Sequence, residues 1–407
     1  MQWGTQHFRK TNSKGYMLVM NANDIAELVY KEYAKSFKPI CKPVVKSNGI
    51  KEWTVLAAVV GYDTVAKAFQ VVSMATGVKV TPDTHLSRSM GKILHDCHAE
   101  ILAIRGFNAV LHDQLRRYNS IKDKTELYLI EKSASTNSFR VGEKWAFYLY
   151  ISEIPCGDSS MNEAIESRDR GENDKQQELI FHDSDLIQYV DPKVRTVLRG
   201  RFNYSKKGFV RTKPGRADSN MSLSKSCSDK LCMKQVTSLN NAITYFLLDS
   251  PVYLSGLVIP NLNRSKMEAL VKSFQRPGKL IAHPVEFLTT DLPFQDQKLQ
   301  EEQTPSSMSG ILLFLQKNKT PKQEAILNGI KNGYFVKGNK PLRKNCESLL
   351  SRYHQWSIFE QSNYFHSYLS FKKSLHKRND LVRKLRDQLS SEGWIHTCSD
   401  YCHAQKV

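Results

Sequence analysis

The sequence lacks the segments that would place a protein in or across a membrane. Its 407 residues contain no run of about 18 apolar residues, which excludes a transmembrane helix. The first residues, MQWG, do not have the basic and then apolar pattern of a secretory signal. No internal repeat is present. We therefore expect an intracellular, soluble protein, in the cytoplasm, the nucleus or both, with no membrane partner.

Cysteine and acidic residues are also scarce. The eight cysteines are spread along the chain, and without a secretory signal this favours buried thiols or metal ligands over disulfides. Only 40 Asp and Glu stand against 59 Lys and Arg, which gives a formal charge of +19. This excess suits a polyanionic partner, because each basic side chain that contacts a phosphate releases counterions. A basic composition alone favours nucleic acid only weakly over an acidic membrane.

Segments with strand and helix patterns alternate along the chain, which is typical of an α/β fold. Runs of β-branched and aromatic residues predict strands, and apolar residues at helical spacing predict helices. We expect one domain over residues 22–395, with flexible tails at 1–21 and 396–407, a polar insertion at 162–178 and a loop at 205–228. The predicted strands are 52–60, with a turn at 61–63, then 68–74, 145–152, 252–260 and 311–315; the predicted helices are 22–36, 97–118, 237–248, 263–274, 342–354 and 365–389.

The strongest chemical signal is His98-Ala99-Glu100, where a strand or loop is predicted to give way to a helix. This spacing brings an imidazole and a carboxylate together near the positive end of the helix. A second element, PCGD at 155–158, follows a predicted strand, and a helix N-terminus or a bound cation would favour the thiolate of Cys156. One histidine and two cysteines around Zn²⁺ leave a fourth position for water, as in catalytic sites. The pattern matches the H-x-E and P-C-x-x-C signature of zinc nucleobase deaminases.

The sequence departs from that signature at the second cysteine, because Ser159 stands three residues after Cys156. Cys227 is the candidate to complete the site, and Cys232 is the alternative. Taken singly, a histidine is more often a core residue and a cysteine a small buried hydrophobe. A second metal-like group lies at the C-terminus, but it lacks a matching knuckle and we expect a loosely ordered tail there. Its members are His396, Cys398, Cys402 and His403.

Three elements in order carry a resemblance to a known family: HAE at 98–100, PCGD at 155–158, and SCSDK at 226–230 preceded by RTKPG at 211–215. Chains with these elements resemble the adenosine deaminases that act on RNA. The resemblance extends from about residue 22 to Trp394. Editing members of the family carry double-stranded-RNA-binding domains ahead of the deaminase, and this sequence has none. It is more similar to the stand-alone members that act on tRNA.

The resemblance implies a cytidine-deaminase-like core, which is a mixed β-sheet flanked by helices, with a helical C-terminal extension packed on it. It implies hydrolytic conversion of adenosine to inosine directly 3′ of the anticodon of alanine tRNA (tRNA position 37), without a required protein partner. The target base must leave its stack to enter such a pocket, which favours an unpaired loop nucleotide.

The resemblance also assigns roles to residues of this chain. His98, Cys156 and Cys227, rather than Cys232, would hold Zn²⁺, and the metal would lower the pKa of its bound water. Glu100 would then shuttle protons between the water, the purine ring and the departing ammonia. Two further residues would form a hydrogen-bonded chain that orients a cysteine ligand. They are Asp96 and Lys213.

Editing members of the family also hold an inositol hexakisphosphate in the core among Lys and Arg side chains. Burying such cations without an anion would be costly, which couples the ligand to the fold. Basic positions of the family are replaced here by Ile104, Met233 and Thr397, so the match is mixed. An alternative is that the basic C-terminal helix is a solvated or RNA-binding face. The expected contacts are Lys79, Arg105, Lys230, Tyr368, Lys372 and Trp394.

Basic residues next to the third motif are candidates for contacts with the anticodon arm. Two other enzyme functions remain open, namely editing of duplex or messenger RNA and deamination of cytidine. A non-catalytic, zinc-stabilised RNA-binding protein is a further alternative, although such a protein would not need Glu100. The candidate RNA contacts are Lys206, Lys207, Arg211, Arg216 and Lys225.

Overall fold

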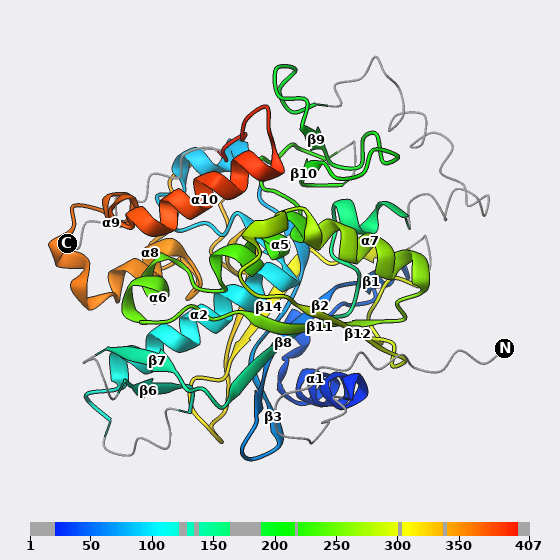
Figure 1. Cartoon of the computed structure of the whole chain (residues 1–407). Coiled ribbons are helices and arrows are strands. Elements are labelled where there is room, and N and C mark those ends of the chain that lie inside the picture. The colour runs from blue at the N-terminus through cyan, green and yellow to red at the C-terminus, as the bar shows by residue number, and fades with distance from the viewer. Residues whose placement is uncertain are drawn as a thin grey trace, which may run out of the picture.

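An eight-stranded mixed sheet forms the centre of the computed structural model, which describes residues 21–121, 128–133, 138–162, 189–215, 219–299, 303–336 and 340–397 (Figure 1). The first three strands of the sheet are parallel, and every later neighbour is antiparallel. Helices cover both faces, so the predicted mixed α/β fold is confirmed. In order across the sheet, the strands are β12 (Glu286–Thr290), β11 (Leu254–Pro260), β8 (Trp145–Ile151), β2 (Leu56–Asp63), β3 (Ala68–Thr76), β14 (Met308–Leu313), β15 (Lys322–Leu327) and β16 (Ile330–Lys331).

Two helices cover opposite faces of this sheet: α1 (Ala22–Ser36) and α2 (Ala99–Arg117) (Figure 1). β2 is buried along its whole length because its alternating side chains enter two separate cores, such as Val59 on the α2 side and Val60 on the α1 side. The helix α2 lies very close to the sheet at Gly106, where a Cβ atom would approach Ser73 Cβ to 2.9 Å. This close contact fixes the position of α2, and so of its first turn, relative to the strands.

Short elements at one edge of this core carry the chemical motifs. β4 (Val78–Val80) pairs with β5 (Asp96–His98), and β5 leads directly into α2. The parallel pair β9 (Val197–Arg199) and β10 (Val210–Thr212) precedes α5 (Cys227–Thr237), which packs against α7 (Arg264–Gln275). The other elements are β1 (Glu52–Trp53), β13 (Thr304–Pro305), β6 (Ile130–Lys132), β7 (Phe139–Val141), α6 (Ala242–Leu247), η1 (Pro39–Cys41), η2 (Asp83–Arg88), η4 (Asp158–Ser160), η5 (Gly278–Leu280) and η6 (Glu360–Tyr364).

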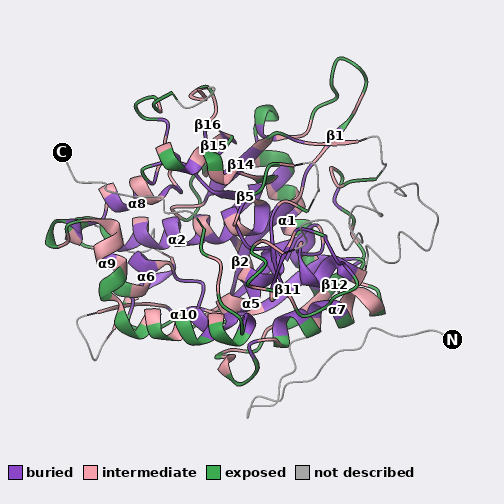
Figure 2. Cartoon of the chain, turned by 90° about the horizontal axis from the view of Figure 1, so that it is seen from above, coloured by how far each residue is buried: buried purple, intermediate pink, exposed green. Residues whose placement is uncertain are grey.

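The C-terminal part is helical and packs on α5 through α10, as predicted, but its helices differ from the expected ones. The single helix at 365–389 is wrong: α9 (Tyr368–Ser374) and α10 (His376–Leu389) are separated at Leu375, whose φ of −80° and ψ of 64° are not helical. The helix at 342–354 is also wrong, because α8 (Arg352–Ser357) begins only where Ser351 caps it. The outer side of α10 is exposed (Figure 2).

Two other predictions were wrong for local reasons. The helix expected at 237–248 begins only at α6, where Asn241 forms a capping box; residues 238–241 are not helical, and Thr237 is the last residue of α5, which was not predicted. The strand expected at 52–60 splits into β1, which pairs with β13, and β2, which continues through the predicted turn. The chain turns later because the Asp63 carboxylate accepts hydrogen bonds from the backbone amides of Val65 and Ala66.

Nearly all of the predicted tails and of the polar insertion at 162–178 lie outside the described residues, and the extent of the domain stays a prediction. Within the part of the chain that the structure describes, no helix has both the length and the apolar character needed to span a bilayer.

Candidate functional site

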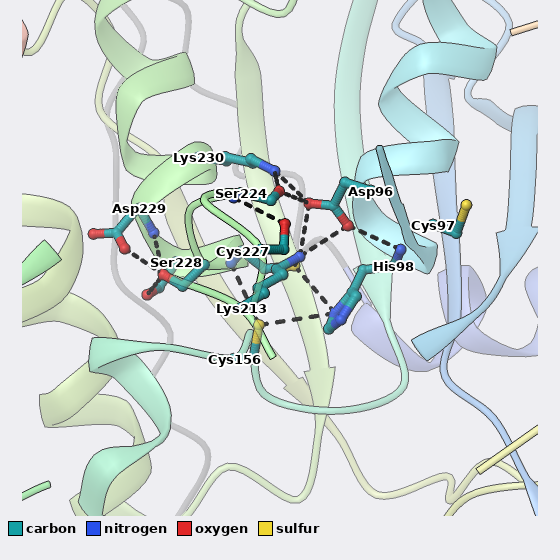
Figure 3. Close-up of polar contacts among 12 residues, drawn as sticks. Asp96, Cys97, His98, Cys156, Lys213, Ser224, Cys227, Ser228, Asp229 and Lys230 are labelled. Atoms are coloured by element: carbon teal, nitrogen blue, oxygen red, sulfur yellow. Dashed lines mark hydrogen bonds and ion pairs between the residues drawn. The ribbon is translucent and has the colours of Figure 1, made fainter. Parts of the chain in front are cut away.

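His98, Cys156 and Cys227 come together at the edge of the core although they are far apart in sequence (Figure 3). Their ligand atoms all lie within 4.8 Å of one another. The His98 Nδ1 atom is 3.8 Å from the Cys156 Sγ and 3.6 Å from the Cys227 Sγ. Nitrogen and two thiolate sulfurs form a donor set suited to Zn²⁺, and three protein ligands leave a fourth position open.

Two chain segments must approach closely to bring the cysteines together. Cys156 follows β8, Cys227 begins α5, and the Ser228 amide donates a 3.0 Å hydrogen bond to the Cys156 carbonyl. Gly157 makes this contact possible, because a Cβ there would lie 2.1 Å from the Ser226 Oγ and its φ is 108°. The glycine of PCGD is therefore a requirement of the metal site.

We expect Gly157→Ala to lower the free energy of unfolding by roughly 1–3 kcal/mol or more and to reduce bound zinc, because the new methyl group pushes the two cysteines apart. Thermal unfolding and metal analysis of the purified protein would measure both effects. Gly49→Ala is the matched control, since Gly49 also has a positive φ, 81°, but no atom lies within 4 Å of the position that its methyl group would take. Equal behaviour of the two variants would contradict the steric argument.

Glu100 lies in the first turn of α2 and is only 3% exposed. Its charge acts on Lys213 and Cys227, so the carboxylate is close to the ligand cluster. One carboxylate oxygen, Oε2, is buried and has no hydrogen-bond partner in the structure. An unpaired buried oxygen is costly, and it is free to bind water or a substrate group.

Asp96 and Lys213 form a buried network with one zinc-ligand candidate (Figure 3). The Lys213 Nζ atom lies 3.0 and 2.8 Å from the two Asp96 oxygens and 2.9 Å from the Cys227 Sγ. Burial alone would raise the pKa of Asp96, but Lys213 and Lys230 outweigh it and hold that pKa well below its usual range. Burial would lower the pKa of Lys213, but Asp96 and Cys227 raise it well above its usual range. The network thus places a fixed positive charge beside the Cys227 sulfur.

The electrostatics of the cluster favour a thiolate at Cys156. A hydrogen bond with Cys227 is the main cause that holds the pKa of Cys156 well below its ordinary value, and the charges of Lys213 and His98 act in the same direction. Cys232, the alternative ligand, is buried away from the cluster, and its thiol donates to the Asp229 carbonyl.

The expected RNA contacts fall into two groups. Lys206 and Lys207 are exposed, as a surface that contacts RNA requires. Arg211 and Lys225 are instead 0% and 5% exposed, and their side chains donate to backbone carbonyls, so neither is part of the predicted surface. They are buried because β10 and the residues before α5 lie inside the fold, which their charge did not indicate. Arg216 lies outside the described residues.

A second group of basic residues converges between α2, α5 and the C-terminal helices. Burial and neighbouring cations lower the pKa of Lys234 and of Lys372 to about 7 each. The guanidinium Nε atoms of Arg378 and Arg386 are buried and have no hydrogen-bond partner in the structure. Such a cluster is unfavourable by itself and fits a bound polyanion. The cations that influence one another here are Arg105, Lys225, Lys230, Lys234, Arg352, Lys372, Arg378 and Arg386.

The sequence alone indicates only part of this cluster. Met233 occupies a position where the family has arginine. Lys234, the next residue along α5, supplies the positive charge instead. Tyr368 lies close enough to Arg105 and Arg378 to act on the pKa of both. The centroid of the Trp394 ring lies 5.2 Å from the Lys225 Nζ atom and 5.4 Å from the Arg386 Cζ atom. Lys79 is exposed on β4 and lines a different, small pocket. The cations missing from the expected contacts are Lys234, Arg352, Arg378 and Arg386; the basic pattern of α10 was a signal for Arg378 and Arg386, and no pattern pointed to the other two.

Comparison with known families agrees with this geometry. A family model described as the adenosine-deaminase (editase) domain matches residues 73–405. The chain belongs to this family. The deaminase is 44% identical over 384 residues to tRNA-specific adenosine deaminase 1 of Saccharomyces cerevisiae, covering 93% of each chain. It is 34% identical over 374 residues to the protein of that name in Schizosaccharomyces pombe, covering 87% of this chain and 89% of the relative.

More distant relatives have different substrates in their names. Double-stranded RNA-specific editase B2 of Mus musculus is 28% identical over 225 residues, which cover 54% of the deaminase and 28% of the relative. Family membership makes the protein an adenosine deaminase and therefore a hydrolase, with a His/Cys/Cys cluster that can hold a metal ion such as zinc.

Proposed function

We propose that this deaminase converts adenosine to inosine in tRNA by zinc-dependent hydrolysis. The observation that carries the proposal is the unpaired, buried carboxylate oxygen of Glu100 beside the convergent ligand atoms of His98, Cys156 and Cys227. The arrangement of the helix α2 against the mixed sheet supports a cytidine-deaminase-like core.

Each residue of the site has a separate role in the reaction. Zinc held by His98, Cys156 and Cys227 would supply Lewis acidity and lower the pKa of a water molecule. Glu100 accepts a proton from the water, delivers one to the purine ring and assists the departure of the amino group as ammonia. Lys213, held by Asp96, keeps the Cys227 sulfur oriented. The reaction consumes one water and releases one ammonia for each inosine.

The choice of tRNA as substrate is supported by relatives that cover almost the whole deaminase and are named tRNA-specific. The relatives named for double-stranded RNA match only about half of it. The resemblance of the motifs to those of the stand-alone members that act on tRNA implies the adenosine directly 3′ of the anticodon of alanine tRNA. A loop adenosine is already unpaired, so its transfer into the pocket costs less than extraction from a duplex.

The purified protein, incubated with an unmodified alanine tRNA transcript, tests this assignment. Inosine is then read as an A-to-G change in the reverse-transcribed product. We expect conversion at the single adenosine 3′ of the anticodon. Conversion of a duplex RNA but not of the tRNA would move the assignment to RNA editing, and no conversion of either by the zinc-loaded protein would overturn it.

We also propose that the cluster around Lys234 and Lys372 holds inositol hexakisphosphate as a structural cofactor. Lowered lysine pKa values and unpaired guanidinium nitrogens support a ligand with many negative charges. Such a ligand would be retained through purification. Denaturation of the purified protein, followed by mass spectrometry of the released small molecules, should recover it in about equimolar amount; release of no polyphosphate from the folded protein as purified would contradict the proposal.

The same cluster predicts how the stability of anion-free protein depends on pH. The pKa of Lys234 and of Lys372 is about 7 in the folded chain and about 10.4 in the unfolded chain, so between these values the unfolded state binds more protons. Stability must therefore rise as the pH increases from about 7 to 10. Thermal unfolding across this range measures the effect, and added inositol hexakisphosphate should remove most of it. A slope that is unaffected by the anion would contradict the prediction.

A further inference from the structure

A basic loop at residues 200–208 lies between β9 and β10 and next to the ligand cluster. The sequence from Asp191 to Asp218 contains nine Lys and Arg between these two residues and no other Asp or Glu. Three cations of the loop, Arg201, Lys206 and Lys207, are exposed. The loop therefore presents positive charge to solvent without acidic residues of its own.

The loop is shaped around the buried side chain of Arg211. The guanidinium donates from Nη1 to the carbonyls of Gly200 and Phe202 at 3.1 and 2.8 Å. It donates from Nη2 to the carbonyls of Asn203 and Lys206 at 3.0 and 2.7 Å. The planar, always-charged fork of arginine suits this task, because it satisfies four carbonyls from one centre. No other side-chain type could hold the loop in this way.

Arg211 also links the loop to the segment that carries Cys227. Its backbone amide donates to the Asp229 carboxylate at 2.9 Å, and its carbonyl accepts from the Ser226 amide at 2.7 Å. The last residue of the loop is attached near the other cysteine, since the Gly208 amide donates a 2.8 Å hydrogen bond to the carboxylate of Asp158. The C-terminal side of the basic loop is thus fixed relative to both cysteines among the zinc-ligand candidates.

We propose that Arg211 is a positioning residue, which holds the 200–208 loop as a phosphate-binding surface at a set distance from the catalytic centre. The partner of this surface is the RNA strand next to the target adenosine, contacted through Lys206 and Lys207. The inference rests on the proposed function and adds to it. A fixed register between phosphates and zinc ligands selects which adenosine enters the pocket, because positioning of a bound substrate sets the attacking geometry.

The test compares two variants. Arg211→Gln removes the guanidinium that binds the four loop carbonyls, which we call the clamp, and the double variant Lys206→Ser and Lys207→Ser removes only surface charge. We expect both to raise the Kd and the KM for the tRNA transcript about tenfold and to flatten the salt dependence of binding. The value of kcat at saturating tRNA and the zinc content should change little. Combining the three substitutions should weaken binding no further than the double variant does, because the clamp acts through those lysines.

Hydrogen exchange and conservative variants separate positioning from general stability. Amides of 200–208 should exchange faster in Arg211→Gln while those of α2 stay protected. If Arg211→Gln does not fold, Arg211→Lys keeps the charge with fewer donors and should give a smaller rise in KM. Arg88→Gln is the matched control, since the Arg88 guanidinium holds a different loop through the carbonyls of Val336 and Lys340, and its KM should stay unchanged.

Three results would overturn the proposal: fully additive losses in the triple variant, an equal rise in KM for Arg88→Gln, or zinc loss without a change in tRNA binding. Unchanged tRNA binding in both the Arg211 and the lysine variants would remove this proposal and leave the proposed function intact. A wild-type protein that does not bind tRNA would remove both.

Discussion

Glu100→Gln is expected to reduce kcat for inosine formation by a factor of roughly 10²–10⁴, the usual contribution of a positioned proton-transfer group. Glutamine keeps the shape of the side chain but cannot accept a proton and return it. The zinc content and the affinity for tRNA should stay nearly unchanged, because neither depends on proton transfer by Glu100. Single-turnover deamination of the tRNA transcript at saturating enzyme measures the chemical step directly.

Glu324→Gln is a matched control for this variant. Glu324 is partly buried, and its carboxylate accepts hydrogen bonds from Ser348 and Leu349 in a part of the fold that includes β15. Its substitution should affect stability and leave kcat unchanged. Retention of full activity in Glu100→Gln would mean that another group moves the protons, and loss of zinc would mean that Glu100 supports the metal site instead.

Lys213→Met is expected to have the largest effect on the folded state. The substitution leaves Asp96 with only Lys230 as a cationic partner and leaves the Cys227 sulfur without its ammonium donor. Removing one member of a buried ion pair typically costs about 3–5 kcal/mol. Loss of a residue that orients a metal ligand typically lowers metal affinity by about 10–100-fold. Denaturant unfolding and zinc competition with a chelator measure the two effects.

Lys144→Met provides the control for Lys213→Met. The Lys144 ammonium lies 2.8 Å from the Asp63 carboxylate, but the lysine side chain is 45% exposed. Exposed ion pairs contribute about 0–1 kcal/mol, so this variant should be almost as stable as the wild type and should bind zinc normally. Similar stability losses in both variants would show that the buried position of Lys213 is not what makes it important.

Much of the fold could be predicted because its core elements carry strong local patterns. β8 and α7 agree with the predicted segments to within a residue, since a dense apolar strand and an amphipathic helix are encoded locally. The weaker helices could not be placed. α5 begins in a Ser- and Lys-rich stretch, and it is stabilised by the Ser226 cap and by packing on α7 and α10, which local propensity does not contain.

The candidate site shows the same division between local and tertiary information. His98 and Glu100 are two residues apart at a helix start, so their proximity follows from local geometry. Burial of charged residues could not be predicted, because Arg211 looks like a surface arginine until its four carbonyl partners are known. The same holds for Lys234, whose part in the buried cluster is apparent only from the neighbouring cations of α2, α9 and α10.

The sequence by itself determined the residue types of this site: the candidate metal ligands, their order, the glutamate proposed to transfer protons and the excess of positive charge. Only the tertiary structure decided which cations are exposed to solvent, which line a buried cluster and which hold a loop in place. The physical reason is that a residue's chemical type is local, whereas its burial and its partners depend on segments that are distant in sequence and meet only in the folded chain.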